Sequence, residues 1–174
     1  MPSPLRIGVP SKGRLSELAG DLLRDAGLKF RRQDRALFAR VKPLSADDQD
    51  AIDITFVRTD DIPVLCAEGA IDLGITGSDL VDEAQVDGKP VEVTERLRLG
   101  VGNCRLAICV PTPSPVVGPK DLAGDRIATS FPNVTRAYLN GHGVSAHIVE
   151  LTGSVEVMIA LGVADAIVDL VYAL

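Results

Sequence analysis

The sequence predicts an α/β protein made of two lobes, each with a mostly parallel sheet, and a cleft between the lobes. Short apolar runs with strand character alternate with segments whose apolar residues recur at helical spacing, which is typical of parallel sheets. A second series of this kind begins after the glycine-containing stretch Leu99–Gly102. We therefore assign residues 1–98 to a first lobe and residues 99–174 to a second.

The first lobe is expected to open with a strand at residues 5–9, followed by a helix. The apolar positions of that helix run from Leu15 to Ala26, and Gly27 closes it. Residues 31–50 have no clean period and predict an irregular or hairpin excursion. The elements expected next are a strand at 52–57, a helix from Asp60 or Asp61 to Gly69 with Pro63 in its first turn, a strand at 71–76 and a helix opened by Ser78 and Asp79.

The second lobe repeats the alternation. Because parallel strands end at one edge of a sheet, binding residues are expected at the carboxyl ends of the strands in both lobes. The elements expected here are strands at 104–110, 126–129, 147–151 and 165–171, a proline-rich loop at 111–115, a helix from Pro132 to the glycines at 141 and 143, and a helix at 154–161.

Composition limits the class of partner. The net charge is −6, aromatic residues make up 3% and tryptophan is absent. Nucleic-acid binding needs a basic face and often stacking rings, so no nucleic-acid partner is expected. An anionic substrate would have to be held by a few local cations and backbone N–H groups.

We expect a cytoplasmic protein with no membrane partner. The apolar stretch in Met1–Val9 is too short for a signal peptide, and no apolar run approaches the roughly 20 residues that span a bilayer. The three cysteines form no C-x-x-C pair, and His142 and His147 lack ligand spacing, so no protein-held metal site is expected.

Two turns of the first lobe could bind an anion. Lys12 and Arg14 flank a glycine where the first helix begins, combining fixed positive charge with unpaired N–H groups. In the second turn Gly77 allows close backbone approach, and Asp79 could accept hydrogen bonds from sugar hydroxyls or an amine. A solvated turn and an ordinary helix cap are the alternative interpretations.

The second lobe offers a third such turn, Thr152-Gly153-Ser154, with Glu156 in the turn that follows. Asp165 and Asp169 are four apart on one expected strand and would share a face. Asp169, near the carboxyl end, suits ribose hydroxyls or a Mg²⁺-bound phosphate, although a charge partner elsewhere would also explain it. No nucleophile–base set, dinucleotide fingerprint or P-loop is present.

Seven segments of the chain form an ordered series. They are Pro10-Ser-Lys-Gly-Arg-Leu15, Arg58-Thr-Asp-Asp-Ile-Pro63, Gly69-Ala-Ile-Asp-Leu-Gly-Ile-Thr-Gly-Ser-Asp79, Leu99-Gly-Val-Gly-Asn-Cys-Arg-Leu106, Arg126-Ile-Ala-Thr-Ser-Phe-Pro132, Glu150-Leu-Thr-Gly-Ser-Val-Glu156 and Gly162-Val-Ala-Asp-Ala-Ile-Val-Asp169. Together they resemble the ATP phosphoribosyltransferase family. This family opens histidine biosynthesis by joining N1 of the adenine of ATP to C1 of phosphoribosyl pyrophosphate, with Mg²⁺ present, and its fold resembles the type II periplasmic binding proteins.

The resemblance implies a pentosyl-transferring enzyme with ATP and phosphoribosyl pyrophosphate as partners, Mg²⁺ carried on their phosphates, a homo-oligomeric state and a separate synthetase-like regulatory subunit. It implies that Lys12 and Arg14 are catalytic and, with Arg58, meet nucleotide or pyrophosphate oxygens. Gly77 and Asp79 would then lie on the ATP side. The residues implied on the phosphoribosyl pyrophosphate side are Thr152, Gly153, Glu156, Asp165 and Asp169, with Asp169 catalytic and on the ribose hydroxyls.

One departure from the family pattern concerns the end of the chain. Family members carry a T/S-G-x-T-L loop for the 5′-phosphate after the strand that holds Asp169, whereas this chain reads Val171-Tyr-Ala-Leu174. We therefore expect a truncated, short-form-like catalytic chain whose own activity is open. The alternatives from other classes are a non-catalytic two-lobed module that binds a small anion or nucleotide, and a transcriptional effector-binding domain.

Overall fold

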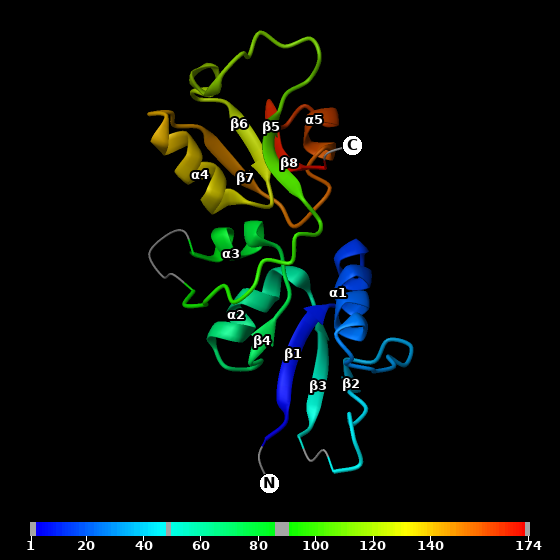
Figure 1. Cartoon of the computed structure of the whole chain (residues 1–174). Helices are drawn as coiled ribbons and strands as arrows, with labels where there is room; N and C mark the ends of the chain where they lie inside the picture. The colour runs from blue at the N-terminus through cyan, green and yellow to red at the C-terminus, as the bar shows by residue number, and fades with distance from the viewer. Residues whose placement is uncertain (1–2, 48–49, 86–90, 173–174) are drawn as a thin grey trace. The chain divides into compact units, whose positions relative to one another are not determined.

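The computed structural model describes residues 3–47, 50–85 and 91–172 (Figure 1). The chain divides into two compact units. Unit 1 contains Met1–Ala84 and Val91–Val101, and unit 2 contains Gln85–Pro90 and Gly102–Leu174. Each unit has its own four-stranded sheet. The sequence-based lobe boundary between residues 98 and 99 stays a prediction.

Unit 1 is built on a sheet with strand order β2-β3-β1-β4. β1 lies between β3 and β4, as Figure 1 shows, and pairs in parallel with both, whereas β2 is antiparallel to β3. In β3 the buried Ile54 and Phe56 alternate with half-buried residues, so one face of the strand is directed to the core. The strands are β1 (Leu5–Pro10), β2 (Phe38–Arg40), β3 (Ile52–Val57) and β4 (Leu73–Gly74).

The helices of unit 1 follow the expected order. In α1 the buried Ala19 and Leu23 are four residues apart and face the core, and Gly27 follows the helix with a φ of 91°. The core combines these residues with Ile7, Val9, Phe30, Ala39, Val41, Ile54 and Phe56. The helices are α1 (Arg14–Asp25), the 3₁₀ turn η1 (Thr59–Asp61), α2 (Ile62–Ala67) and α3 (Ser78–Gln85).

Unit 2 has strand order β5-β8-β6-β7, with β6 parallel to β7 and β8, and β5 antiparallel to β8. Its largest core cluster centres on Ile127, Leu139 and Val168. Its strands are β5 (Cys104–Cys109), β6 (Arg126–Thr129), β7 (His147–Glu150) and β8 (Ala166–Tyr172). Its helices are η2 (Pro119–Leu122), α4 (Pro132–Gly141) and α5 (Val157–Ala160).

The same module occurs in both units. The series β1-α1-β3-α2-β4 in unit 1 corresponds to β6-α4-β7-α5-β8 in unit 2, and the first strand of each series lies between the other two. In each sheet the only non-parallel strand is an edge strand, β2 or β5, among the described residues. The prediction of two α/β lobes with mostly parallel sheets is therefore confirmed.

Three details differ from the expectations. The strand expected at 71–76 is paired only at Leu73–Gly74, and the helix expected at 154–161 begins at Val157. Ser154 has a φ of 52°, outside the helical region, and cannot be part of that helix. Asp61 holds the N-cap position of α2 but makes no capping side-chain hydrogen bond. The excursion at 31–50 contains β2 and is a hairpin with β3; its residues 48 and 49 lie outside the described chain, as do Ala173 and Leu174.

Candidate functional site

The turns that carry the predicted residues of unit 1 follow its three parallel strands. We call the edge where the parallel strands of a unit end its carboxyl edge. At the carboxyl edge of unit 1, Ser11–Gly13 follows β1, Arg58 follows β3, and 75–77 follows β4. The structure thereby brings Lys12, Arg14, Arg58, Gly77 and Asp79 to one edge of one sheet.

The turn after β1 presents two cations at the start of a helix. Gly13 is the N-cap of α1, with φ 84° and ψ −175°, and makes no side-chain cap. Lys12 and Arg14 flank it and are both exposed. The amino end of α1 adds partial positive charge, so this turn has the charge and the backbone geometry to bind an anion.

Arg58 lies where β3 passes into η1. Its Nε is 3.5 Å from Oδ1 of Asp60, with side chains 64% and 56% exposed, so this ion pair is weak and Arg58 can exchange it for a ligand. A hollow of about 470 Å³ adjoins Arg58. The hollow is lined by Ser11, Leu37, Phe56, Val57, Arg58, Asp61, Val64 and Leu65.

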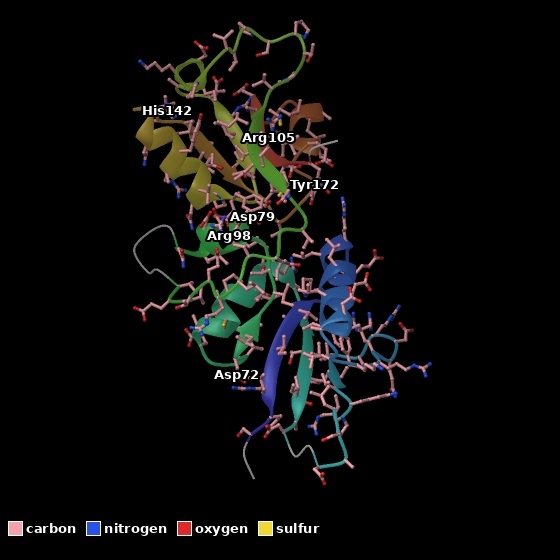
Figure 2. The ribbon with its side chains drawn as sticks, viewed as in Figure 1. Asp72, Asp79, Arg98, Arg105, His142 and Tyr172 are labelled. Atoms are coloured by element: carbon pink, nitrogen blue, oxygen red, sulfur yellow. The ribbon has the colours of Figure 1, made fainter. Side chains whose placement is uncertain are left out.

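Asp79 is the second residue of α3 and is half-buried. Burial raises the pKa of Asp79, although hydrogen bonds from the N–H groups of Asp79 and Leu80 oppose the shift. A Cβ on Gly77 would collide with the Asp79 carboxylate, so the glycine leaves room for it. Figure 2 shows Asp79 and Asp72 beyond the two ends of the short strand β4, which places Asp79 at the carboxyl edge.

In unit 2 the loop after β7 carries three predicted residues, Thr152, Gly153 and Glu156, all exposed. Asp169 lies on β8 one residue beyond the β6–β8 register, whose last pair is Thr129 with Val168. One oxygen of its carboxylate accepts a hydrogen bond from the N–H of Leu170 at 2.8 Å. These four residues are therefore at the carboxyl edge of unit 2.

Asp165 is at the opposite edge of that sheet. It precedes β8 and accepts a hydrogen bond from the N–H of Arg126 at 2.9 Å, and the Arg126 Nε lies 3.5 Å from the same carboxylate. The backbone hydrogen bond, above all, holds the pKa of Asp165 below its ordinary value. Asp165 comes four positions before Asp169 in the chain, which corresponds to about 13 Å in extended backbone. The structure does not bring the two aspartates together.

The sequence model of the ATP phosphoribosyltransferase family matches residues 58–173. The chain belongs to this family. It is 60% identical, over 96% of its length, to the ATP phosphoribosyltransferase of Rhodopirellula baltica, and 44% identical, over 95%, to that of Methanopyrus kandleri. It covers 52% and 55% of those two proteins, so it spans about half the length of the curated relatives that it matches.

A solved structure of an ATP phosphoribosyl transferase (HisG:HisZ) complex from Thermotoga maritima has the same fold. The TM-score is 0.75 at 28% identity, and the match covers 97% of this chain and 75% of that one. The fold class expected for the ATP phosphoribosyltransferase family therefore agrees with the structure of both units.

Sequence reasoning missed three side chains that join segments at the carboxyl edges of the two units. Thr76 donates from Oγ1 to the carbonyl of Thr59 at 3.0 Å and joins two turns of unit 1. Thr129, fully buried, donates to the carbonyl of Val168 at 3.0 Å. Arg32 donates to the carbonyl of Ser11 at 2.6 Å. Each contact joins segments that are distant in the sequence, so no local sequence pattern predicts it.

Residues 3–47, 50–85 and 91–172 contain neither a candidate metal-binding cluster nor a helix suited to a membrane. No group of three or more His, Cys, Asp and Glu side chains there could hold a metal ion. None of the helices in this part of the chain has the length and apolar character needed to cross a membrane.

Proposed function

We propose that the protein containing this chain transfers the phosphoribosyl group of phosphoribosyl pyrophosphate to N1 of ATP. The products are phosphoribosyl-ATP and pyrophosphate, and the reaction is the first step of histidine biosynthesis. The observation that carries the proposal is the 60% identity, over 96% of the chain, to a relative named for this activity. The chain spans 52% of that relative, so the activity is proposed for the whole protein.

ATP is proposed to bind at the carboxyl edge of unit 1. Lys12 and Arg14 would hold phosphate oxygens at the amino end of α1, and the exposed Arg58 would join them. Asp79, beside Gly77, would accept hydrogen bonds from the adenine amine or the ribose. Its raised pKa supports this role, because a donor that pairs with the carboxylate would offset its cost of burial.

Phosphoribosyl pyrophosphate is proposed to bind at the carboxyl edge of unit 2. Thr152, Gly153 and Glu156 would line its site from the loop after β7, with Asp169 on the ribose hydroxyls. Asp165 belongs to the same sequence-based set. It lies at the opposite edge of the sheet, so contact with substrate would need both the loss of its hydrogen bond with Arg126 and a displacement toward the carboxyl edge.

The reaction needs positioning more than an activated nucleophile. The lone pair on adenine N1 forms a bond to C1 of the ribose while the bond from C1 to the pyrophosphate oxygen breaks, and the bonding electrons leave with pyrophosphate. Positive charge develops on the ribose, where the Asp169 carboxylate would stabilise it. Lys12 and Arg14 would stabilise phosphate charge and hold the reactants in line.

Mg²⁺ is proposed to accompany the substrate phosphates. When bound, it would neutralise charge on the pyrophosphate. Mg²⁺ typically takes one or two carboxylates together with phosphate oxygens and water. Asp169, half-buried at the carboxyl edge of unit 2, is a carboxylate of the right kind and place to contribute.

The proposed assembly is a homo-oligomer in the cytoplasm with a separate regulatory subunit. The name of the Thermotoga maritima structure, a HisG:HisZ complex, supports such a subunit.

The test is an absorbance assay for phosphoribosyl-ATP with ATP, phosphoribosyl pyrophosphate and Mg²⁺. It should be run on the whole protein and on the 174-residue chain, each with and without a candidate regulatory subunit. We expect the whole protein to form phosphoribosyl-ATP and its Lys12→Ala variant to form none. Absence of product from the whole protein under all these conditions would favour the non-catalytic binding module.

A further inference from the structure

Arg32 is part of the hairpin excursion before β2, yet it contacts the turn after β1. Its Nη1 donates to the carbonyl oxygen of Ser11 at 2.6 Å, and its Nε donates to the carbonyl oxygen of Ala36 at 3.0 Å. Its Cζ lies 4.2 Å from the centre of the Phe56 ring. Three directed contacts therefore hold one half-buried guanidinium.

These contacts fix the backbone of Ser11 from two sides. The N–H of Ser11 donates to the carbonyl of Val57 at 2.8 Å, and its carbonyl accepts from Arg32. Ser11 is followed directly by Lys12 and by Gly13, the N-cap of α1. The start of the proposed anion-binding turn is thus held by β3 on one side and by Arg32 on the other.

The aromatic ring on which Arg32 stacks is buried and packed against a second ring. Phe56 is 5% exposed, and its ring lies 6.2 Å from that of Phe30, which is also buried and is covered by Arg24 at 4.6 Å. A planar guanidinium can stack on such a ring and still donate to two carbonyl groups. A lysine ammonium is a point charge without this fork, so lysine would keep the charge and lose the geometry.

We propose that Arg32 is a positioning residue for the turn Ser11–Arg14. It acts on the ligand of that turn through the Ser11 carbonyl and does not touch the ligand. The choice of ATP as ligand rests on the proposed function, whereas the effect on the turn does not.

The experiment combines two measurements on the 174-residue chain. Amide hydrogen exchange at Ser11 reports the turn, and calorimetric titration with ATP reports binding. The variants are Arg32→Gln and Arg32→Lys, with Arg31→Gln as the matched control because Arg31 is the adjacent, exposed arginine. Both Arg32 variants are expected to speed Ser11 exchange and to weaken ATP binding about tenfold, whereas Arg31→Gln changes neither.

A double-mutant cycle separates positioning from a direct role. In a Lys12→Ala background, Arg32→Gln is expected to add little further loss of ATP affinity, because the Lys12 cation that Arg32 helps to position is already absent. Full additivity would overturn the proposal, as would unchanged Ser11 exchange in both Arg32 variants. If Arg32→Gln fails to fold, Arg32→Lys carries both readouts. Faster exchange without any ATP binding by the parent chain would contradict the proposed ligand and leave the positioning role supported.

Discussion

Arg126 and Asp165 join β6 to β8 at their amino ends, and the pair recurs in unit 1 as Arg6 and Asp72. In each pair the aspartate carboxylate accepts a hydrogen bond from the backbone N–H of the arginine, at 2.9 Å and 2.8 Å respectively. In each, the aspartate N–H donates to the arginine carbonyl, at 2.8 Å and 2.9 Å. In each unit, two hydrogen bonds thereby join two strands that are not consecutive in the chain.

The guanidinium completes the arrangement in the same way in both units. It donates to the carbonyl of a glycine three residues before the aspartate, Gly162 at 3.2 Å and Gly69 at 2.8 Å. Both glycines have a positive φ, 68° and 74°, which other residues rarely adopt. The same set of hydrogen bonds among an arginine, a glycine and an aspartate therefore occurs in both copies of the module.

Removing either aspartate should destabilise its unit. Asp165→Ala and Asp72→Ala each leave a backbone N–H of an arginine without its acceptor, and we expect the melting temperature to fall by about 2–4 °C. Differential scanning calorimetry measures the change. Glu68→Ala, which removes an exposed carboxylate of unit 1, is the control and should have no effect. Equal melting temperatures for the aspartate variants and the control would contradict the assigned role.

Asp72 and Asp165 should also make the stability of the protein depend on pH. Hydrogen bonding to the Arg6 side chain chiefly lowers the pKa of Asp72, and the backbone N–H of Arg126 chiefly lowers that of Asp165. The stabilisation is therefore present above the unfolded pKa of about 3.9 and is lost as pH falls through the lower folded value. The gap in melting temperature between the parent and the double alanine variant should close over that range. A gap as wide at pH 2 as at pH 7 would exclude this linkage.

Asp79→Asn should raise the stability of the protein at pH 7, whereas removing Asp72 or Asp165 should lower it. Burial raises the pKa of Asp79, so its contribution favours folding most below about pH 3.9 and is lost as pH rises through the folded value. At pH 7 the asparagine variant should be more stable by less than about 1 kcal/mol, because the side chain is only half-buried. Urea denaturation at pH 7 and pH 3 measures this. A gain in stability at pH 3 that equals the gain at pH 7 would argue against burial as the cause.

Arg58→Ala should weaken ATP binding without lowering stability. A charge-assisted contact to phosphate is lost, which corresponds to about tenfold in affinity, whereas the exposed pair with Asp60 contributes little to folding. Isothermal titration calorimetry with ATP measures the change, and Lys120→Ala, which removes an exposed cation of unit 2, is the control. Unchanged affinity would remove Arg58 from the site.

Gly8→Ala should lower the free energy of unfolding by about 1–3 kcal/mol. Gly8 of β1 pairs with Gly74 of β4, and a Cβ at Gly8 would collide with the buried Ile71 side chain. Gly118→Ala is the control, since its φ of −162° suits any residue and nothing lies within 4 Å of its Cβ position. Urea denaturation compares them. A loss in Gly8→Ala no larger than that of the control would show that Ile71 can move aside.

The elements with a long pattern could be predicted from the sequence. Strand β3 was expected at its observed bounds because its apolar residues alternate, and α1 was expected to within a residue of its ends. By contrast, β4 is two residues long, too short to carry a period, and its start depends on Asp72 meeting Arg6, 66 residues away. Short elements held by distant contacts leave no signal in their own residues.

The residues of the candidate site differ in the same way: some are marked by a local sequence pattern, and others are placed by distant contacts. Lys12 and Arg14 flank a glycine between a strand and a helix, a local pattern that predicts their place at the carboxyl edge. Asp165 and Asp169 were expected to share a strand face, but β8 begins at Ala166, and Asp165 turns to Arg126 instead, 39 residues away. Arg32 lies in a segment without periodicity, so its contact with Ser11 could come only from the folded structure.

The separate cores have a consequence for how the chain melts. The main buried cluster of unit 1 is drawn from residues 7–56, and the two clusters of unit 2 are drawn from residues 122–168. Residues that are buried in the same core unfold together, so two units with separate cores can unfold in separate transitions. A calorimetric trace with two peaks would then assign each variant to its own half, with Gly8→Ala moving one peak and Asp165→Ala the other.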